Sequence, residues 1–316
     1  MMKFFKAEHH IPFMSLAKWA VRFSILMMIL SVVLFFARGL NYGIDFRGGT
    51  EMKITVPETQ SVGDVRGILT GQVKGELSVN TESGADAGMQ AMKVRISSTG
   101  EEAALSEEKI SALKTFVTTE IPDSEVKGVT SIGGAVSGEL VTKGMLAIGL
   151  TLIAISIYIW LRFEWQFSFG AVIALAHDVT LTIGLFSLLQ LTFDLSIVAA
   201  ILAIIGYSLN DTVVVYDRIR EKLDISKSEP IETVIDRGIN ETLRRTTMTS
   251  FTTIIAVAAL YIFGGAELRG FSFAMLWGVC VGTYSSIFIA SPILTYFGLD
   301  RADKPKSTTK FADIDA

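Results

Sequence analysis

The sequence contains few of the residues that build metal, redox and nucleotide sites. Its one cysteine, Cys280, lies in an apolar stretch, so no disulfide can form within the chain. The three histidines, His9, His10 and His177, are not spaced as metal ligands, and we expect no metal. A Gly-rich loop of the P-loop kind is also absent, so we expect no ATP binding by that route. We also expect no cofactor and no enzymatic activity.

Charged residues are scarce as well, at 19% of the chain against 50% hydrophobic residues, with a mean hydropathy of +0.48. A soluble domain carries about a quarter charged residues. A bilayer core of about 30 Å needs about 20 mostly apolar residues in a helix. Six segments meet this requirement: Trp19–Ala37, Gly144–Leu161, Phe167–Leu189, Leu195–Val215, Thr246–Phe263 and Phe271–Phe297. The composition therefore predicts a polytopic α-helical membrane protein with six transmembrane helices.

Lysine and arginine in the short loops predict the orientation, because they stay on the cytoplasmic side. One side holds nearly all of them: Lys3, Lys6, Lys18, Arg22, Arg162, Arg218, Arg220, Lys222, Lys227, Arg237, Arg244, Arg245, Arg301, Lys304, Lys306 and Lys310. The opposite short loops, Leu189–Ser196 and Gly264–Gly270, hold only Arg269. We therefore predict that both termini are cytoplasmic, and that the first span is a retained anchor rather than a cleaved signal peptide.

This topology divides the chain into five parts. They are a cytoplasmic lead (residues 1–18), transmembrane helix 1 (19–38), a periplasmic domain (39–143), transmembrane helices 2–6 (144–299) and a cytoplasmic tail (300–316).

The periplasmic segment alternates apolar and polar residues, which is typical of strands, or repeats apolar residues at helical spacing. The predicted strands are Glu51–Val56, a weak Leu77–Val79, Met92–Ser97 and Glu125–Ile132, and the predicted helices are Ser61–Val73 and Ser106–Ile121. The order β-α-β-β-α-β predicts a small ferredoxin-like α+β domain. Glu82–Gly88 is predicted as a loop in the middle of this domain. Gly48-Gly49 and Gly133-Gly134 flank the domain and are predicted as hinges or turns.

Ionisable residues within the spans are the candidate functional residues, because a charge at the bilayer centre costs about 2.5 kcal/mol or more. Asp211 lies in the fourth span and His177-Asp178 in the third. Arg244 and Arg245 enter the fifth span at a matching depth, and Arg245, Thr249 and either Thr252 or Thr253 share one helical face. A carboxylate opposite an arginine and hydroxyls indicates an ion pathway. The alternative is a buried structural pair, and His177 has the further alternative of a plain interhelical hydrogen bond.

A ladder of small residues runs along the sixth span. It consists of Gly270, Ala274, Gly278, Gly282, Ser286 and Ala290. Small residues at every fourth position allow two helices to approach closely, so we predict a packing role, centred on Gly278, Gly282 and Ser286.

Several motifs along the chain resemble, in order and depth, those of the SecF subunits of the SecD/SecF family, within the resistance-nodulation-division (RND) superfamily. The matching segments are Asp45–Thr50, Phe163–Trp165, Ala174–Asp178, Gly206–Val215, Asp217–Glu221, Thr242–Ser250, Phe263–Gly265 and Gly282–Ile287. The resemblance implies half of an RND-type membrane domain, and a bacterial inner-membrane protein that, with SecD, uses the proton-motive force to promote preprotein translocation.

The resemblance also assigns residues and partners. The family's carboxylate falls on Asp211, its arginine on Arg245 and a hydroxyl on Thr249, with Asn210 beside them. His177, Asp178, Ser208 and Thr252 are accessory candidates. The implied partners are SecD, the SecYEG channel with YajC and YidC, the translocating preprotein and membrane lipid, with no nucleic acid. The coupling ion is H⁺, with Na⁺ left open.

Two other functions compete with this interpretation. A small-solute or drug transporter of the RND superfamily would use the same carboxylate and arginine, but usually shows a second repeat or a pocket-bearing outer domain. A structural assembly subunit would have no need for Asp211 at depth and would tolerate leucine there.

Overall fold

The computed structural model describes residues 10–73, 75–82, 88–97 and 104–297. The predictions for residues 1–9 of the lead, for 83–87 of the loop Glu82–Gly88 and for the tail 300–316 therefore lie outside the described residues, as do the basic residues in those segments.

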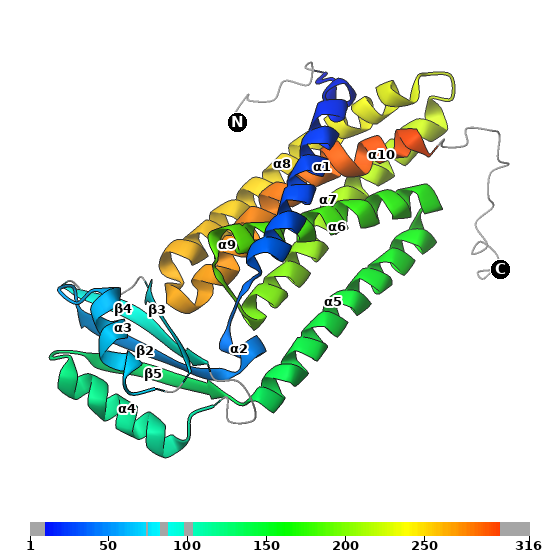
Figure 1. The fold of residues 1–316 in the computed structure, drawn as a ribbon. Helices are drawn as coiled ribbons and strands as arrows, with labels where there is room; N and C mark the ends of the chain where they lie inside the picture. Colours follow the sequence, from blue (N-terminus) through cyan, green and yellow to red (C-terminus); the bar gives the residue numbers. More distant parts are fainter. Residues whose placement is uncertain (1–9, 74, 83–87, 98–103, 298–316) are drawn as a thin grey trace, which may run out of the picture.

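Among the described residues, six helices are long and apolar enough to cross a membrane, as predicted (Figure 1). They are α1 (Phe13–Arg38), α5 (Gly134–Arg162), α6 (Trp165–Leu189), α7 (Leu195–Ile225), α8 (Ile231–Phe263) and a last helix formed by α9 (Gly265–Ser285), η1 (Ser286–Ala290) and α10 (Ser291–Tyr296). α7 and α8 run well beyond the apolar stretches. The predicted loop Gly264–Gly270 is wrong, because only Gly264 separates α8 from α9.

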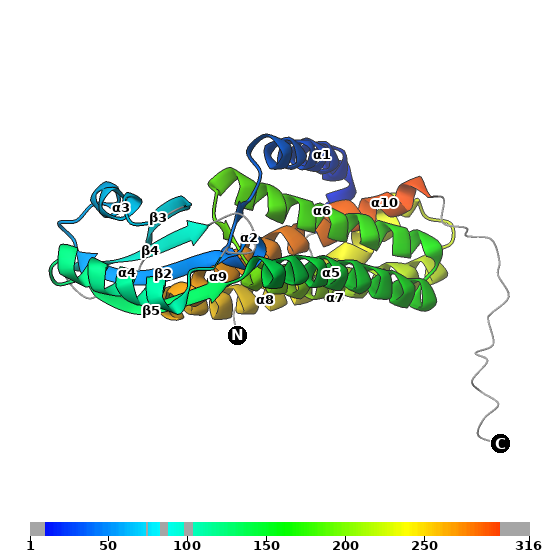
Figure 2. The same ribbon diagram turned by 60° about the horizontal axis from the view of Figure 1, so that its bottom comes forward.

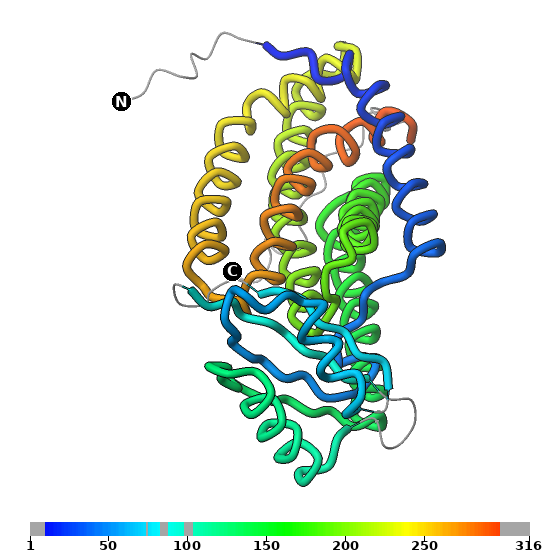
Figure 3. The backbone as a smooth tube through the Cα atoms, turned by 60° about the vertical axis from the view of Figure 1, so that its left-hand side comes forward, coloured from blue at the N-terminus to red at the C-terminus, as the bar shows by residue number. Residues whose placement is uncertain are grey.

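Three of these helices form the inner layer of the bundle. Of the most apolar stretch of each helix, 44% is buried in α6, 50% in α7 and 61% in the last helix, against 11% in α1, α5 and α8. Figure 3 shows α1 (blue) and α8 (yellow) on opposite flanks of the bundle. Since the flanking helices bury so little, they present apolar surface to lipid or to another chain.

The ladder of small residues on α9 faces α7. A Cβ atom added to Gly282 would lie 2.9 Å from Ser208 Cβ, and one added to Gly278 would lie 2.8 Å from Ile204 Cγ2. Real Cβ atoms essentially never approach that closely, so glycine permits this close crossing of two helices.

The last helix contains a π-helical turn, η1, that the sequence did not indicate. A π turn leaves backbone groups displaced from their usual i→i−4 partners. Here Ser291 Oγ donates to Ser286 O at 2.9 Å, and the Tyr216 hydroxyl of α7 donates to Ala290 O at 2.9 Å. The widened turn is therefore hydrogen-bonded to α7.

A small α+β domain, the sheet domain, lies at one end of the bundle between α1 and α5 (Figures 1 and 2). Its elements are β2 (Gly49–Pro57), α3 (Val62–Thr70), β3 (Glu76–Glu82), β4 (Met89–Ser97), α4 (Glu107–Glu120) and β5 (Glu125–Ile132). The antiparallel sheet has the order β3-β4-β2-β5, so both β-α-β units are split by an intervening strand. This confirms the ferredoxin-like prediction, and the weak strand proves to be a full one.

One face of this sheet carries the domain's core. Alternate residues of the strands, such as Met52, Val79 and Val94, pack against α3 and α4 through Val65 and Leu113. Because side chains alternate across a strand, the residues in between point to the opposite face, and many of these are charged.

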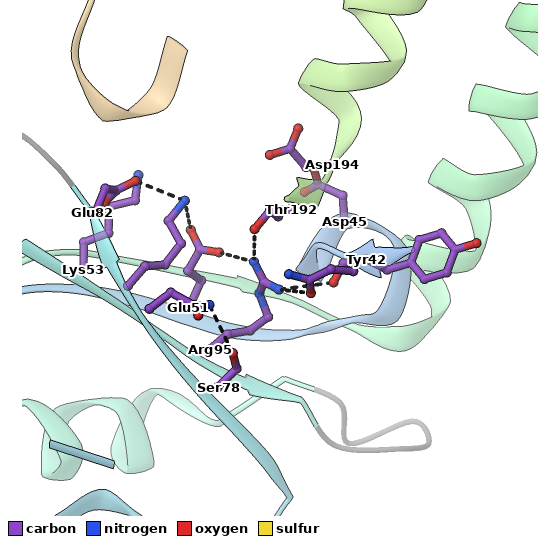
Figure 4. Close-up of polar contacts among 12 residues, drawn as sticks. Tyr42, Asp45, Glu51, Lys53, Ser78, Glu82, Arg95, Thr192 and Asp194 are labelled. Carbon is purple, nitrogen blue, oxygen red and sulfur yellow. Dashed lines mark hydrogen bonds and ion pairs between the residues drawn. The ribbon is translucent and has the colours of Figure 1, made fainter. Parts of the chain in front are cut away.

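The charged face docks on the bundle through Arg95, which is only 5% exposed (Figure 4). β1 (Asn41–Tyr42) pairs in parallel with β6 (Thr192–Phe193) at the bundle surface. The Arg95 guanidinium donates to Tyr42 O at 3.2 Å and to Thr192 Oγ1 at 3.2 Å, and it lies 3.6 Å from Glu51 Oε2. One side chain thus joins the sheet to two segments of the bundle, β1, which follows α1, and β6, which follows α6.

Replacing Arg95 with leucine is expected to loosen this docking. Leucine cannot donate the hydrogen bonds that the Arg95 guanidinium makes. Their buried acceptors are left unpaired, and each unpaired acceptor costs about 1–3 kcal/mol of stability. We expect faster hydrogen exchange in β1 and β6 of the assembled protein. Lys114→Met, at an exposed position of α4, is the matched control and should leave exchange there unchanged. Equal exchange in both variants would show that Arg95 does not anchor the domain.

The glycine pair at the start of β2 is required by its backbone. Gly48 and Gly49 have φ angles of 71° and 131°, and a Cβ on Gly49 would lie 2.5 Å from Ile96 O. They follow a single helical turn, α2 (Ile44–Arg47), which the sequence did not predict. The pair Gly133-Gly134 differs, since Gly133 is extended at φ −70° and precedes the first residue of α5.

A capping box starts α3, as the pattern Ser61–Asp64 predicts. Hydrogen bonds from the side chain and backbone of Ser61 lower the pKa of Asp64 below its usual value of 3.8. The ionised carboxylate therefore stabilises α3 at pH above about 4, and this contribution is lost as the pH falls through the lowered pKa.

The prediction is a pH-dependent difference between the wild type and Asp64→Asn. Hydrogen exchange of α3, compared at the same pH, should be faster in the variant near neutral pH, and the two should converge in acid. Glu120→Gln at the far end of α4 is the control, and exchange of α3 in this variant should match the wild type at every pH. A difference for Asp64→Asn that persists at the lowest pH would contradict the capping role.

Candidate functional site

Asp211 lies on the buried face of α7 with one carboxylate oxygen unmatched. The residue is 4% exposed, and its Oδ2 has no hydrogen-bond partner within the described part of the chain. Two buried hydroxyls also lack a hydrogen-bond partner within the described residues. They are Thr212 Oγ1, on the next residue of α7, and Thr246 Oγ1, on α8. Buried polar atoms are almost always paired, so these three unmatched atoms distinguish the surroundings of Asp211 from ordinary helix packing.

Arg245 supplies the positive charge of the site. Both its charge and the Thr246 hydroxyl act on the Asp211 carboxylate, yet Thr246 Oγ1 does not reach hydrogen-bonding geometry. Arg245 is exposed on α8, while Thr246 is 1% exposed and turned inward. A buried hydroxyl and the charge of an arginine therefore both act on this carboxylate.

The other hydroxyls predicted for the pathway bond to their own helix. Thr249 Oγ1 donates to Arg245 O at 3.0 Å and to Thr246 O at 2.9 Å. Thr252 is exposed on α8, and its hydroxyl donates to Met248 O at 3.0 Å. Such bonds occupy the hydroxyl proton, although the oxygen can still accept one from water.

Asn210 is exposed on α7, away from the buried face that carries Asp211. It continues an exposed line of small residues on the same helix, Ala199, Ala203 and Gly206. No described helix of this chain covers that line closely enough to bury it.

The structure places His177 and Asp178 in a separate, fully buried cluster. Both residues are 0% exposed. Asp178 Oδ1 lies 2.9 Å from His177 Nδ1, and Oδ2 accepts from Ser208 Oγ at 2.6 Å and from Ser285 Oγ at 2.9 Å. Ser285, 107 residues from Asp178, was not among the predicted residues. In contrast to Asp211, both oxygens of this carboxylate are satisfied.

A second set of hydroxyls ties α8 to the inner helices. Tyr207 donates to Ser250 Oγ at 3.1 Å, and Ser250 Oγ lies 2.7 Å from Thr283 Oγ1. α7, α8 and α9 therefore meet through polar contacts at the level just beyond Asp211 toward the sheet domain.

Comparison with known proteins identifies the family. The model for the protein export membrane protein SecD/SecF, C-terminal, matches residues 112–300, and the model for the SecD/SecF GG motif matches residues 33–56. The chain belongs to the SecD/SecF family. It is a subunit of the SecF type in Sec protein export, and hence a multi-pass transport protein rather than an enzyme.

Similarity to the SecF subunits runs the length of the chain. The protein translocase subunit SecF of Cereibacter sphaeroides is 42% identical over an alignment of 320 positions, which covers 100% of this chain and 99% of that protein. The protein translocase subunit SecDF of Brucella abortus is 42% identical over 307 residues, 97% of this chain but 39% of that protein. In that relative, the counterpart of this chain is only part of a longer polypeptide.

Solved structures share the fold. The crystal structure of SecDF from Thermus thermophilus, described as a translocon-associated membrane protein, superposes with a TM-score of 0.85 and 33% identity over 92% of this chain. SecDF in its super-membrane-facing form gives a TM-score of 0.65 at 34% identity over 90%. The chain spans 39% of the first SecDF chain and 38% of the second.

Proposed function

We propose that this chain couples the proton-motive force to preprotein translocation, and that Asp211 is the residue that takes up and releases the proton. The observation that carries the proposal is the unmatched Oδ2 of Asp211, buried beside the unmatched hydroxyls of Thr212 and Thr246. A buried carboxylate with an unfilled acceptor is what a gradient-driven step needs, whereas a structural carboxylate would have its acceptors filled.

Arg245 makes the cycle reversible in this proposal. Its positive charge offsets part of the cost of burying an ionised carboxylate, so Asp211 can release the proton as well as take it up. The same charge disfavours a bound metal cation, which is why we assign the coupling ion as H⁺ rather than Na⁺. Water ordered by Thr249 would connect the carboxylate to the aqueous phase.

A second six-helix half completes the pathway in this proposal. SecDF relatives carry both halves in one polypeptide, so we propose a separate SecD subunit as the partner of this chain. The exposed line Ala199, Ala203, Gly206 and Asn210 on α7 offers it a surface that a partner helix can approach closely. SecYEG, with YajC and YidC, and the preprotein would complete the assembly in the bacterial inner membrane.

The orientation follows from the basic loops. Both termini are proposed to be cytoplasmic and the sheet domain periplasmic, where it would meet the emerging preprotein. When Asp211 is protonated, the attraction to Arg245 is lost, and the two halves are proposed to repack. One charge crossing about 100 mV releases about 2.3 kcal/mol, so a substantial pull requires several protons.

A comparison of two gradients tests the coupling ion. Inverted membrane vesicles containing this chain and its SecD partner would be given either a proton or a sodium gradient, and the late, ATP-independent stage of preprotein import would be measured. We expect the proton gradient alone to drive import, and a protonophore to abolish it. Import that follows only the sodium gradient would overturn the assignment of H⁺.

A further inference from the structure

The buried cluster around Asp178 has a role distinct from that of Asp211. We propose that Asp178 is a positioning residue: through Ser208 and Ser285 it fixes α7 against α6 and α9, and so holds Asp211 at its place opposite α8. This inference rests on the proposed function of Asp211, and it assigns no ion to Asp178 itself.

The contacts of Asp178 link the three inner helices at one point. From α6, its Oδ2 accepts hydrogen bonds from Ser208 on α7 at 2.6 Å and from Ser285 on α9 at 2.9 Å, while His177 Nδ1 lies 2.9 Å from Oδ1. A buried carboxylate needs partners for its oxygens, and these partners come from two other helices, so the three helices are held in register.

Ser208 transmits this constraint to Asp211. The two residues are three apart on α7, and residues with this spacing are neighbours on one face of a helix. Ser208 also packs where α9 comes close, because a Cβ on Gly282 would lie 2.9 Å from Ser208 Cβ. The turn that leads into Asp211 therefore has no freedom to rotate or slide while Ser208 is bonded.

A second contact fixes the same stretch of α7 from its other end. Tyr216 is 0% exposed, and its hydroxyl donates to Ala290 O in the π turn at 2.9 Å. Ser208 and Tyr216 are eight residues apart, about 12 Å along the helix. Asp211 lies between them along the helix and is also buried. The segment is thus held at both ends, and its unmatched carboxylate projects from a fixed backbone.

The test separates a positioning role from an ion-carrying one. In Asp178→Asn the amide oxygen still accepts from both serines, so gradient-driven import in vesicles with SecD should stay within about threefold of the wild type. Ser208→Ala combined with Ser285→Ala removes both donors, and import should fall by about tenfold or more because Asp211 is misplaced. Ser272→Ala is the matched control, since this buried α9 serine donates to Leu268 O of its own helix.

Carbodiimide modification of Asp211 provides a readout that does not depend on transport. In purified, assembled complexes, its rate and pH profile should change in the double serine variant and match the wild type in Asp178→Asn and Ser272→Ala. If the double variant does not assemble, Ser208→Ala alone should produce a smaller change in the same direction.

Two results would overturn the positioning role. Loss of import in Asp178→Asn with unchanged modification of Asp211 would mean that Asp178 carries the ion itself. Wild-type import and wild-type modification in both the double serine variant and Ser208→Ala would mean that the cluster does not position Asp211. Failure of the proposed function is recognised separately, by full gradient-driven import in Asp211→Asn.

Discussion

Asp211→Asn is expected to reduce gradient-driven preprotein import to the level measured without a gradient. Asparagine fills nearly the same space and can still hydrogen-bond, so folding and assembly with SecD should be retained. It cannot take up or release a proton, and the step that depends on the charge of Asp211 is therefore lost. Import into inverted vesicles, with and without a proton gradient, measures the effect directly.

Two controls make this result specific. Asp211→Glu restores a titratable carboxylate and should recover part of the gradient response. Asp217→Asn changes an exposed aspartate of the same helix, paired with Arg162 and Arg220 at the helix end, and should leave the response intact. Full gradient-driven import in Asp211→Asn would favour the alternative of a structural assembly subunit.

Gly184→Leu is expected to prevent α1 from packing on α6. A Cβ at position 184 would lie 2.8 Å from Ser31 Cα, which is backbone and cannot move aside as a flexible side chain does. Overpacking a close contact costs about 1–3 kcal/mol and occasionally more, and a leucine against backbone belongs at or above the upper end. The assembled protein should accumulate poorly and melt at a lower temperature in detergent.

Gly149→Leu is the matched control for this substitution. Gly149 lies in α5, where no atom is within 4 Å of an added Cβ. The same change there adds a leucine to an open surface, and accumulation and melting should resemble the wild type. Equal losses in both variants would point to a general effect of leucine in the spans rather than to the α1–α6 contact.

The fold was largely predictable because two patterns persist over many residues. Long apolar blocks predict six membrane helices, and alternation in segments such as Met92–Ser97 predicts the strands of the sheet domain. The missing elements depend on contacts far apart in the chain. β1 exists only because it pairs with β6, about 150 residues later, and the π turn after Ser285 is hydrogen-bonded by Tyr216 of another helix.

The candidate site was predicted only where burial alone is informative. A carboxylate in an apolar helix is costly at any orientation, so Asp211 could be selected without a structure. Threonines carry no such cost, and nothing in the run from Thr246 to Thr253 shows which hydroxyl faces α7. Thr246 and Thr212 were missed for this reason, while the roles of Asp211, Arg245, Thr249 and Asn210 stay predictions.

Proton uptake during transport tests the central claim most directly. In vesicles containing this chain and SecD, the internal pH would be followed with a dye while a preprotein completes its import. We predict a proton flux that requires the moving preprotein in the wild type and disappears in Asp211→Asn together with gradient-driven import. An equal, preprotein-dependent flux in Asp211→Asn would contradict the assignment of Asp211 as the proton-carrying residue.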